Sequence, residues 1–169
     1  MNTAMFKLKL IIKKSFKVLD AISTLLEHLT PLGDLLLRGW VAHAFWVSGM
    51  IKLQNWSSTQ YLFQYEYSAP LLSPLIAAIL ATSIELCGPL LLGLGLFGRS
   101  IAGLMFLFNI IAVISYPDLG AAGLEQHAVW GIMLLVCVFH GPGTWSIDTL
   151  IKHLNVPALN KIKNRNSKT

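Results

Sequence analysis

The feature that most constrains the fold is an apolar run, "LIAAILATSIELCGPLLLGLGLFGR", which covers residues 75–99 and holds one carboxylate, Glu85, near its middle. About 20 apolar residues are needed for a helix to cross the hydrocarbon core of a bilayer. An ionised side chain at that depth is costly unless it is neutralised, hydrated or paired. The run therefore predicts a membrane-spanning helix and makes the partner of Glu85 the central question.

The composition also indicates a membrane protein. The 169 residues are 54% hydrophobic and only 12% charged, whereas soluble domains are about a quarter charged. Four apolar segments stand out, at 35–53, 71–97, 100–116 and 124–140. They do not alternate between apolar and polar positions, so helices fit them better than the strands of a barrel. The predicted fold class is an all-α membrane protein, a four-transmembrane-helix bundle preceded by an N-terminal amphipathic interfacial helix.

The N-terminal segment has its own pattern. Over residues 5–29, leucines and isoleucines share one helical face and lysines the other, which is typical of a helix that lies on an anionic membrane surface. Packing on a partner protein is the alternative. The following "TPLGD" predicts a break, with Thr30 capping the next helix and Pro31 at its first position. We therefore divide the chain into a basic surface helix (1–30), a four-helix transmembrane domain (31–151) and a basic cytoplasmic tail (152–169).

The distribution of basic residues predicts the orientation. Eleven of the thirteen lie before the first span, at Arg99, or after the fourth span. Because loops rich in Lys and Arg stay in the cytoplasm, both termini are expected there. The basic ends flank an apolar body rather than a polar recognition surface, so the expected partner is a lipid bilayer and not nucleic acid.

Two cations in the first span are candidate partners for Glu85. Arg38 and Lys52 lie on nearly the same helical face, with the small residues Ala42 and Gly49 between them. We expect Arg38 to be the main partner and Lys52 to extend to the outer interface. A structural ion pair that fixes helix packing is the alternative to a functional one.

Other polar residues extend this site. Asn109 and Tyr116 share one face of the third span, and with Arg38, Lys52 and Glu85 they form the predicted intramembrane polar pocket. A bond from Asn109 to a neighbouring helix is the simpler interpretation. Three residues are expected at the outer mouth: Asp118, Glu125 and His127. The aromatic-rich loop after the first span should lie in the outer headgroup layer, with a lid over a cavity as the alternative.

The fourth span carries one face with Gln126, Trp130, Met133, Cys137 and His140. Met, Cys and His are ligands that suit copper, but at helical spacing such a stripe is more often ordinary packing, so no metal site is expected. The two cysteines lie far apart and form no C-x-x-C pair, which argues against a thiol-oxidising mechanism.

Three segments, "LLLRGWVAHAFWVSGMIKL", "IELCGPLLLGLGLFGRS" and "GPGTWSID", together resemble the DoxX family of small bacterial inner-membrane proteins over about residues 35–151. The segments "LFQYEYSAPLLSP", "FNIIAVISYPDLG" and "HAVWG" resemble its HvfX-like branch, which is often encoded beside enzymes that modify metal-binding peptides. The resemblance implies a multi-pass bundle in the cytoplasmic (inner) membrane. It also implies that Arg38, Lys52, Glu85 and Arg99 are family positions.

The resemblance leaves three functions open. Relatives are tied to quinone-linked electron transfer, which implies a redox-associated membrane subunit with a quinone in the bundle core, contacted by Arg38, Glu85 and Asn109. The alternatives are a non-catalytic membrane anchor or assembly partner for soluble redox or peptide-modifying enzymes, and a small transporter or metal-handling protein. No catalytic residue is assigned, and a homo-oligomer is compatible with each function.

Overall fold

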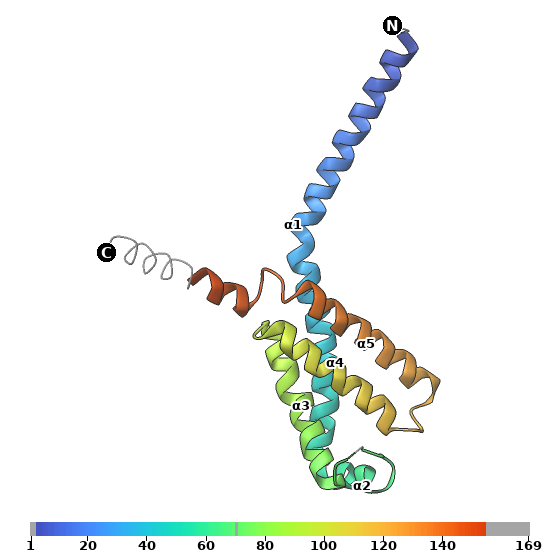
Figure 1. Cartoon of the computed structure of the whole chain (residues 1–169), viewed down its shortest axis with the longest axis vertical. Coiled ribbons are helices and arrows are strands. Elements are labelled where there is room, and N and C mark those ends of the chain that lie inside the picture. The colour runs from blue at the N-terminus through green and yellow to red at the C-terminus, as the bar shows by residue number, and fades with distance from the viewer. Residues whose placement is uncertain (1–2, 70, 155–169) are drawn as a thin grey trace, which may run out of the picture. The chain divides into compact units, whose positions relative to one another are not determined.

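The computed structural model describes residues 3–69 and 71–154, and the ordered elements in this part of the chain are all helices (Figure 1). They are α1 (Thr3–Gln54), α2 (Trp56–Tyr65), α3 (Pro74–Leu94), α4 (Gly98–Ser115) and α5 (Gly120–His140), followed by a helical stretch at 147–154. The predicted all-α class is confirmed for these residues. Most of the predicted basic tail, from residue 155 onward, lies outside them.

Three of the helices, α3, α4 and α5, are long and apolar enough to cross a membrane. Pro74 stands at the first position of α3, where a missing N–H costs nothing, and Gly95 ends the helix with a left-handed φ of 66°. The fourth predicted span, 35–53, lies within α1. Its two cations, two tryptophans and one histidine make it less apolar than the other three.

The predicted break at residues 30–34 is wrong, because α1 continues through it with Pro31 inside the helix. The Thr30 hydroxyl donates to the carbonyl of Leu26 at 3.3 Å instead of capping a new helix. A proline removes one intrahelical hydrogen bond, and the leucines on either side of Pro31 are strong helix formers. The chain nevertheless separates into two compact units, 1–33 and 34–169.

In the first unit, residues 12–30 are exposed on every side. The exposed residues include large apolar side chains at helical spacing: Ile12, Phe16, Leu19, Ile22, Leu26 and Leu29. A helix with this much uncovered apolar surface needs a lipid or protein partner.

The core of the second unit is built where four helices meet. Its buried apolar residues are Val41, Ala42 and Phe45 of α1, Leu92 of α3, Ala102 and Met105 of α4, and Leu134 and Cys137 of α5. Most of the remaining large apolar side chains of α3, α4 and α5 point outward and are exposed. This inside-out distribution suits a lipid environment, since lipid tails solvate apolar surface as well as a protein core does.

The aromatic-rich segment after α1 differs from the expected loop. It forms α2, whose Thr59 and Phe63 are buried. Phe63 packs with Ala77, Ala78 and Ala81 of α3 in a second, smaller core. The segment is therefore packed against α3 at the end of the bundle where α3 begins (Figure 1).

Candidate functional site

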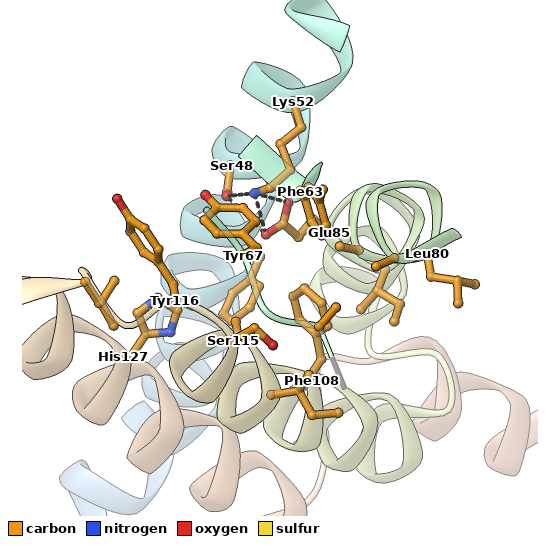
Figure 2. A pocket seen from close by; sticks show the side chains of 18 of the residues that line it. Ser48, Lys52, Phe63, Tyr67, Leu80, Glu85, Phe108, Ser115, Tyr116 and His127 are labelled. Atoms are coloured by element: carbon orange, nitrogen blue, oxygen red, sulfur yellow. Dashed lines mark hydrogen bonds and ion pairs between the residues drawn. The ribbon is translucent and has the colours of Figure 1, made fainter. Parts of the chain in front are cut away.

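The second unit contains a partly open cavity of about 400 Å³, lined by α1, α2, α3, α4, α5 and the segments that connect them. This volume lies within the range of about 300–1,000 Å³ that is usual for small-molecule sites. Most of the wall is aliphatic or aromatic, but seven polar or ionisable side chains also reach it: Ser48, Lys52, Tyr67, Glu85, Ser115, Tyr116 and His127. Figure 2 shows how these residues face the cavity.

The polar centre of the cavity is an ion pair between Lys52 and Glu85. The Lys52 ammonium lies 2.7 Å from Oε2 and 2.9 Å from Oε1 of Glu85. Ser48 joins the pair, because it accepts a hydrogen bond from Lys52 at 2.8 Å and donates one to Glu85 at 3.1 Å (Figure 2). The two charged side chains are only 18% and 7% exposed. The carboxylate is thus neutralised within the protein rather than facing lipid.

Two helices have to approach closely for this pair to form. Ser48 and Lys52 are four residues apart on α1, so they share one face. Gly49 lies between them, and a Cβ atom there would stand 2.9 Å from Cβ and 3.0 Å from the backbone C and O of Glu85. Only a glycine lets α1 reach α3 at this level.

The prediction that Arg38 is the main partner of Glu85 is wrong. Arg38 is buried, and its guanidinium donates to the backbone carbonyls of Pro142 and of Trp145, the latter at 2.7 Å. Helical side chains tilt toward the N-terminus of their helix. The side chain of Lys52 therefore points back along α1 toward Glu85, whereas that of Arg38 points away from it.

Arg38 belongs to a second polar cluster at the opposite end of the bundle. There the carboxylate of Asp148 accepts hydrogen bonds from the N–H groups of Phe97 and Gly98, both at 2.9 Å, and so caps the start of α4. Asp34 contacts His140 at 3.0 Å. Arg99 is exposed near Gly141. This cluster ties the segment after α5 to the rest of the unit, and none of these residues lines the cavity.

Asn109 and His127 form a third polar contact, between α4 and α5. The Asn109 amide nitrogen donates to the backbone carbonyl of His127 at 3.0 Å, and its oxygen lies 2.7 Å from Nδ1 of the same residue. Asn109 is therefore bonded to a neighbouring helix and does not line the cavity, whereas Tyr116 does. His127 was expected at the outer mouth with Asp118 and Glu125, but it is half-buried and lines the cavity, while those two carboxylates are exposed.

An aromatic cluster forms another part of the wall. The ring of Tyr67 stands edge-on to the rings of Phe63 and Tyr116, with distances of 4.8 Å and 4.9 Å between the ring centres. Burial raises the pKa of Tyr67, and the neighbouring Tyr116, Glu85 and Glu66 raise it further. The Tyr67 hydroxyl consequently stays protonated, and able to donate, at neutral pH.

Sequence reasoning missed several cavity residues, among them Ser48, Phe63, Tyr67 and Ser115. Ser48 could have been found, because it lies one helical turn before Lys52. Phe63 and Tyr67 come from the aromatic-rich segment after α1, whose packing against α3 leaves no periodic signal, and Ser115 is the last residue of α4. The Ser115 hydroxyl is buried without a hydrogen-bond partner among the described residues, so it is a further polar group that a ligand could satisfy.

The Met133, Cys137 and His140 stripe does not converge on a metal site. Cys137 is buried in the core and Met133 packs against it, whereas His140 is exposed and contacts Asp34. Within residues 3–69 and 71–154, no group of three or more His, Cys, Asp or Glu side chains is arranged to hold a metal ion.

The fold and the site together define a helical membrane protein with an ion pair, Lys52–Glu85, in the wall of a largely apolar cavity. The DoxX family model matches residues 33–117, about half of the chain, and the chain belongs to the DoxX family. The matched region includes both Lys52 and Glu85 and ends before His127 and Asp148. No curated protein and no solved structure matches the chain.

Proposed function

We propose that this protein is a redox-associated subunit of the bacterial inner membrane that binds the head group of a quinone or quinol in the cavity. The observation that carries the proposal is the Lys52–Glu85 pair in the wall of a cavity that is otherwise mostly apolar and aromatic. An ion pair that served packing alone would have no need of an adjoining ligand-sized space.

The chemistry of the wall suits such a head group. A quinone ring is flat and uncharged, with an oxygen on each of two opposite edges, so it needs an apolar slot with a few polar groups at its rim. Phe45, Phe108 and Trp130 supply the aromatic surface. The hydroxyls of Tyr67 and Ser115 supply donors. Because Lys52 and Glu85 cancel in charge, the cavity favours an uncharged ligand over a free ion.

We further propose that residues 34–54 of α1 form a fourth span and that both termini are cytoplasmic. The support is that Val41, Ala42 and Phe45 share one core with α3, α4 and α5, and that eleven of the thirteen basic residues lie on one side of this topology. In this arrangement the five lysines before residue 18 belong to the cytoplasmic side, where anionic lipid attracts basic residues. The sequence segments quoted above favour the HvfX-like branch.

The binding proposal is tested with the full chain in lipid nanodiscs, titrated with decylubiquinone while tryptophan fluorescence is recorded. We expect saturable quenching that is largely lost in Trp130→Phe, because Trp130 lines the cavity. The double variant Lys52→Gln/Glu85→Gln removes the polar centre without leaving an unpaired charge. It should weaken binding about tenfold or more, which corresponds to about 1.4 kcal/mol.

Glu66→Gln is the matched control, because Glu66 is an exposed carboxylate outside the cavity. It should bind decylubiquinone like the wild type. Equal saturation curves for the wild type and the double variant would show that the quinone merely partitions into the lipid.

A further inference from the structure

The contact between Asn109 and His127 determines which nitrogen of the His127 ring carries a hydrogen. A backbone carbonyl can only accept hydrogen bonds, so the Asn109 group that lies 3.0 Å from the carbonyl of His127 has to be the amide NH2. The amide oxygen of Asn109 then faces Nδ1 of His127 at 2.7 Å. Since that oxygen is also only an acceptor, Nδ1 has to donate.

This assignment leaves the second ring nitrogen as an acceptor. In a neutral imidazole one nitrogen carries the hydrogen and the other carries a lone pair, so Nε2 of His127 presents a lone pair. His127 lines the cavity (Figure 2), and its Nε2 has no hydrogen-bond partner among the residues that the structure describes. The ring is held in place by Asn109 and by Trp130, whose ring centre lies 5.0 Å away.

The polar groups of the cavity therefore differ in whether they require a hydrogen-bond acceptor or a hydrogen-bond donor on the ligand. The hydroxyls of Tyr67 and Ser115 can donate to a ketone oxygen or to a phenol oxygen, so they do not distinguish a quinone from a quinol. Nε2 of His127 does distinguish them. It accepts a hydrogen bond from a hydroxyl, whereas a carbonyl oxygen placed there would oppose one lone pair with another.

We infer that His127 makes the cavity selective for a ligand that presents a hydroxyl group, the quinol rather than the quinone, and that Asn109 is the positioning residue that sets this preference. The inference rests on the proposed function and adds the oxidation state that the site holds more tightly. It concerns binding and assigns no electron-transfer step to this chain.

The selectivity is measured by titrating the full chain in nanodiscs with decylubiquinol and with decylubiquinone under argon. The wild type should bind the quinol about 3- to 10-fold more tightly than the quinone. This ratio corresponds to the free-energy contribution of one neutral hydrogen bond. His127→Phe should bring the ratio of the two affinities close to one. Asn109→Leu should do the same with His127 still present, because the ring is then free to take the other tautomer. His43→Phe, an exposed histidine on α1, is the control and should keep the wild-type ratio.

A second measurement needs no ligand. In the full chain labelled with nitrogen-15 histidine, the signals lost in His127→Phe belong to His127. They should show a protonated Nδ1 and an unprotonated Nε2, and in Asn109→Leu this pattern should give way to a mixture of tautomers. A protonated Nε2 in the wild type would overturn the inference even if the variants fold poorly.

The outcomes separate the two proposals. Equal affinity for both oxidation states, or tighter binding of the quinone, overturns the selectivity of His127 and leaves the proposed quinone site standing. Saturable binding of neither state overturns both.

Discussion

Lys52 and Glu85 stabilise the bundle only as a pair, because each alone would be an uncompensated charge in a largely apolar wall. Their side chains are mostly buried, and Ser48 bonds to both. Breaking a buried ion pair by removing one partner is commonly worse than replacing both, since a single change leaves the other charge without compensation.

We therefore expect Lys52→Gln and Glu85→Gln each to lower the free energy of unfolding by about 3 kcal/mol. The effect of Glu85→Gln should be the smaller one, because the charge that it leaves without compensation, Lys52, is the more exposed of the two. The double variant should recover part of this loss. Thermal unfolding of the wild type, the two single variants and the double variant in one detergent gives the coupling energy of this double-mutant cycle. Strictly additive losses would show that the two residues do not interact.

The same residues show what the sequence allowed to be predicted. Glu85 stood out because a lone carboxylate in an apolar run needs a partner, and this reasoning led to the correct helix, α1. It selected the wrong cation, because a helical wheel gives the face of a side chain and not its direction along the axis. Once the tilt toward the N-terminus is included, Lys52 and not Arg38 reaches Glu85.

At the level of the helices, the site depends on how closely α1 approaches α3. Gly49 is a point of close approach, since an added methyl group would collide with both the side chain and the backbone of Glu85. Backbone atoms of a packed helix have little freedom to move aside, so the helices themselves would have to separate.

We expect Gly49→Ala to destabilise the protein by about 1–3 kcal/mol through overpacking, and to weaken quinone binding by moving Lys52 away from Glu85. Gly39→Ala is the matched control, because it makes the same change in the same helix at a position with open space around it. Helix propensity alone should make the control neutral or slightly stabilising. Unfolding midpoints that change equally in both variants would contradict a close contact at Gly49.

Helix positions were predicted better than helix contacts. The apolar runs at 71–97, 100–116 and 124–140 place α3, α4 and α5 to within a few residues, because a chain in lipid has to satisfy its backbone within each span. Two features were missed: α2, whose helix is stabilised by packing Phe63 on α3, and the continuity of α1 through Pro31. Both are cases in which local signals are overridden by neighbouring residues.

At the level of the whole molecule, the proposed topology depends on whether residues 34–54 cross the bilayer. Three helices meet the requirements of a span by length and composition, and an even number of crossings is needed to bring both termini to the same side. The basic residues before residue 18 and after residue 151 favour that arrangement.

We expect reporters fused before residue 1 and after residue 168 to be active in the cytoplasm, and a reporter inserted within 55–66 to be active in the periplasm. Each position is tested with two reporters, a fluorescent protein that is active in the cytoplasm and an alkaline phosphatase that is active in the periplasm. The two should give opposite results at every position, so each is the control for the other. If the N-terminal and the 55–66 positions report the same compartment, residues 34–54 do not span the membrane.

The segment after α5 has a consequence for how the protein is made. The acceptors of Arg38 are 104 and 107 residues further along the chain, and the carboxylate that caps α4 follows the N–H groups it binds by about fifty. While the ribosome is still synthesising α5, Arg38 has no acceptor and α4 has no cap. Completion of the bundle is therefore one of the last events of synthesis, and a chain that stops before residue 142 carries an unmatched cation in α1. Such a product presents to the membrane quality-control proteases a charge that the finished protein conceals.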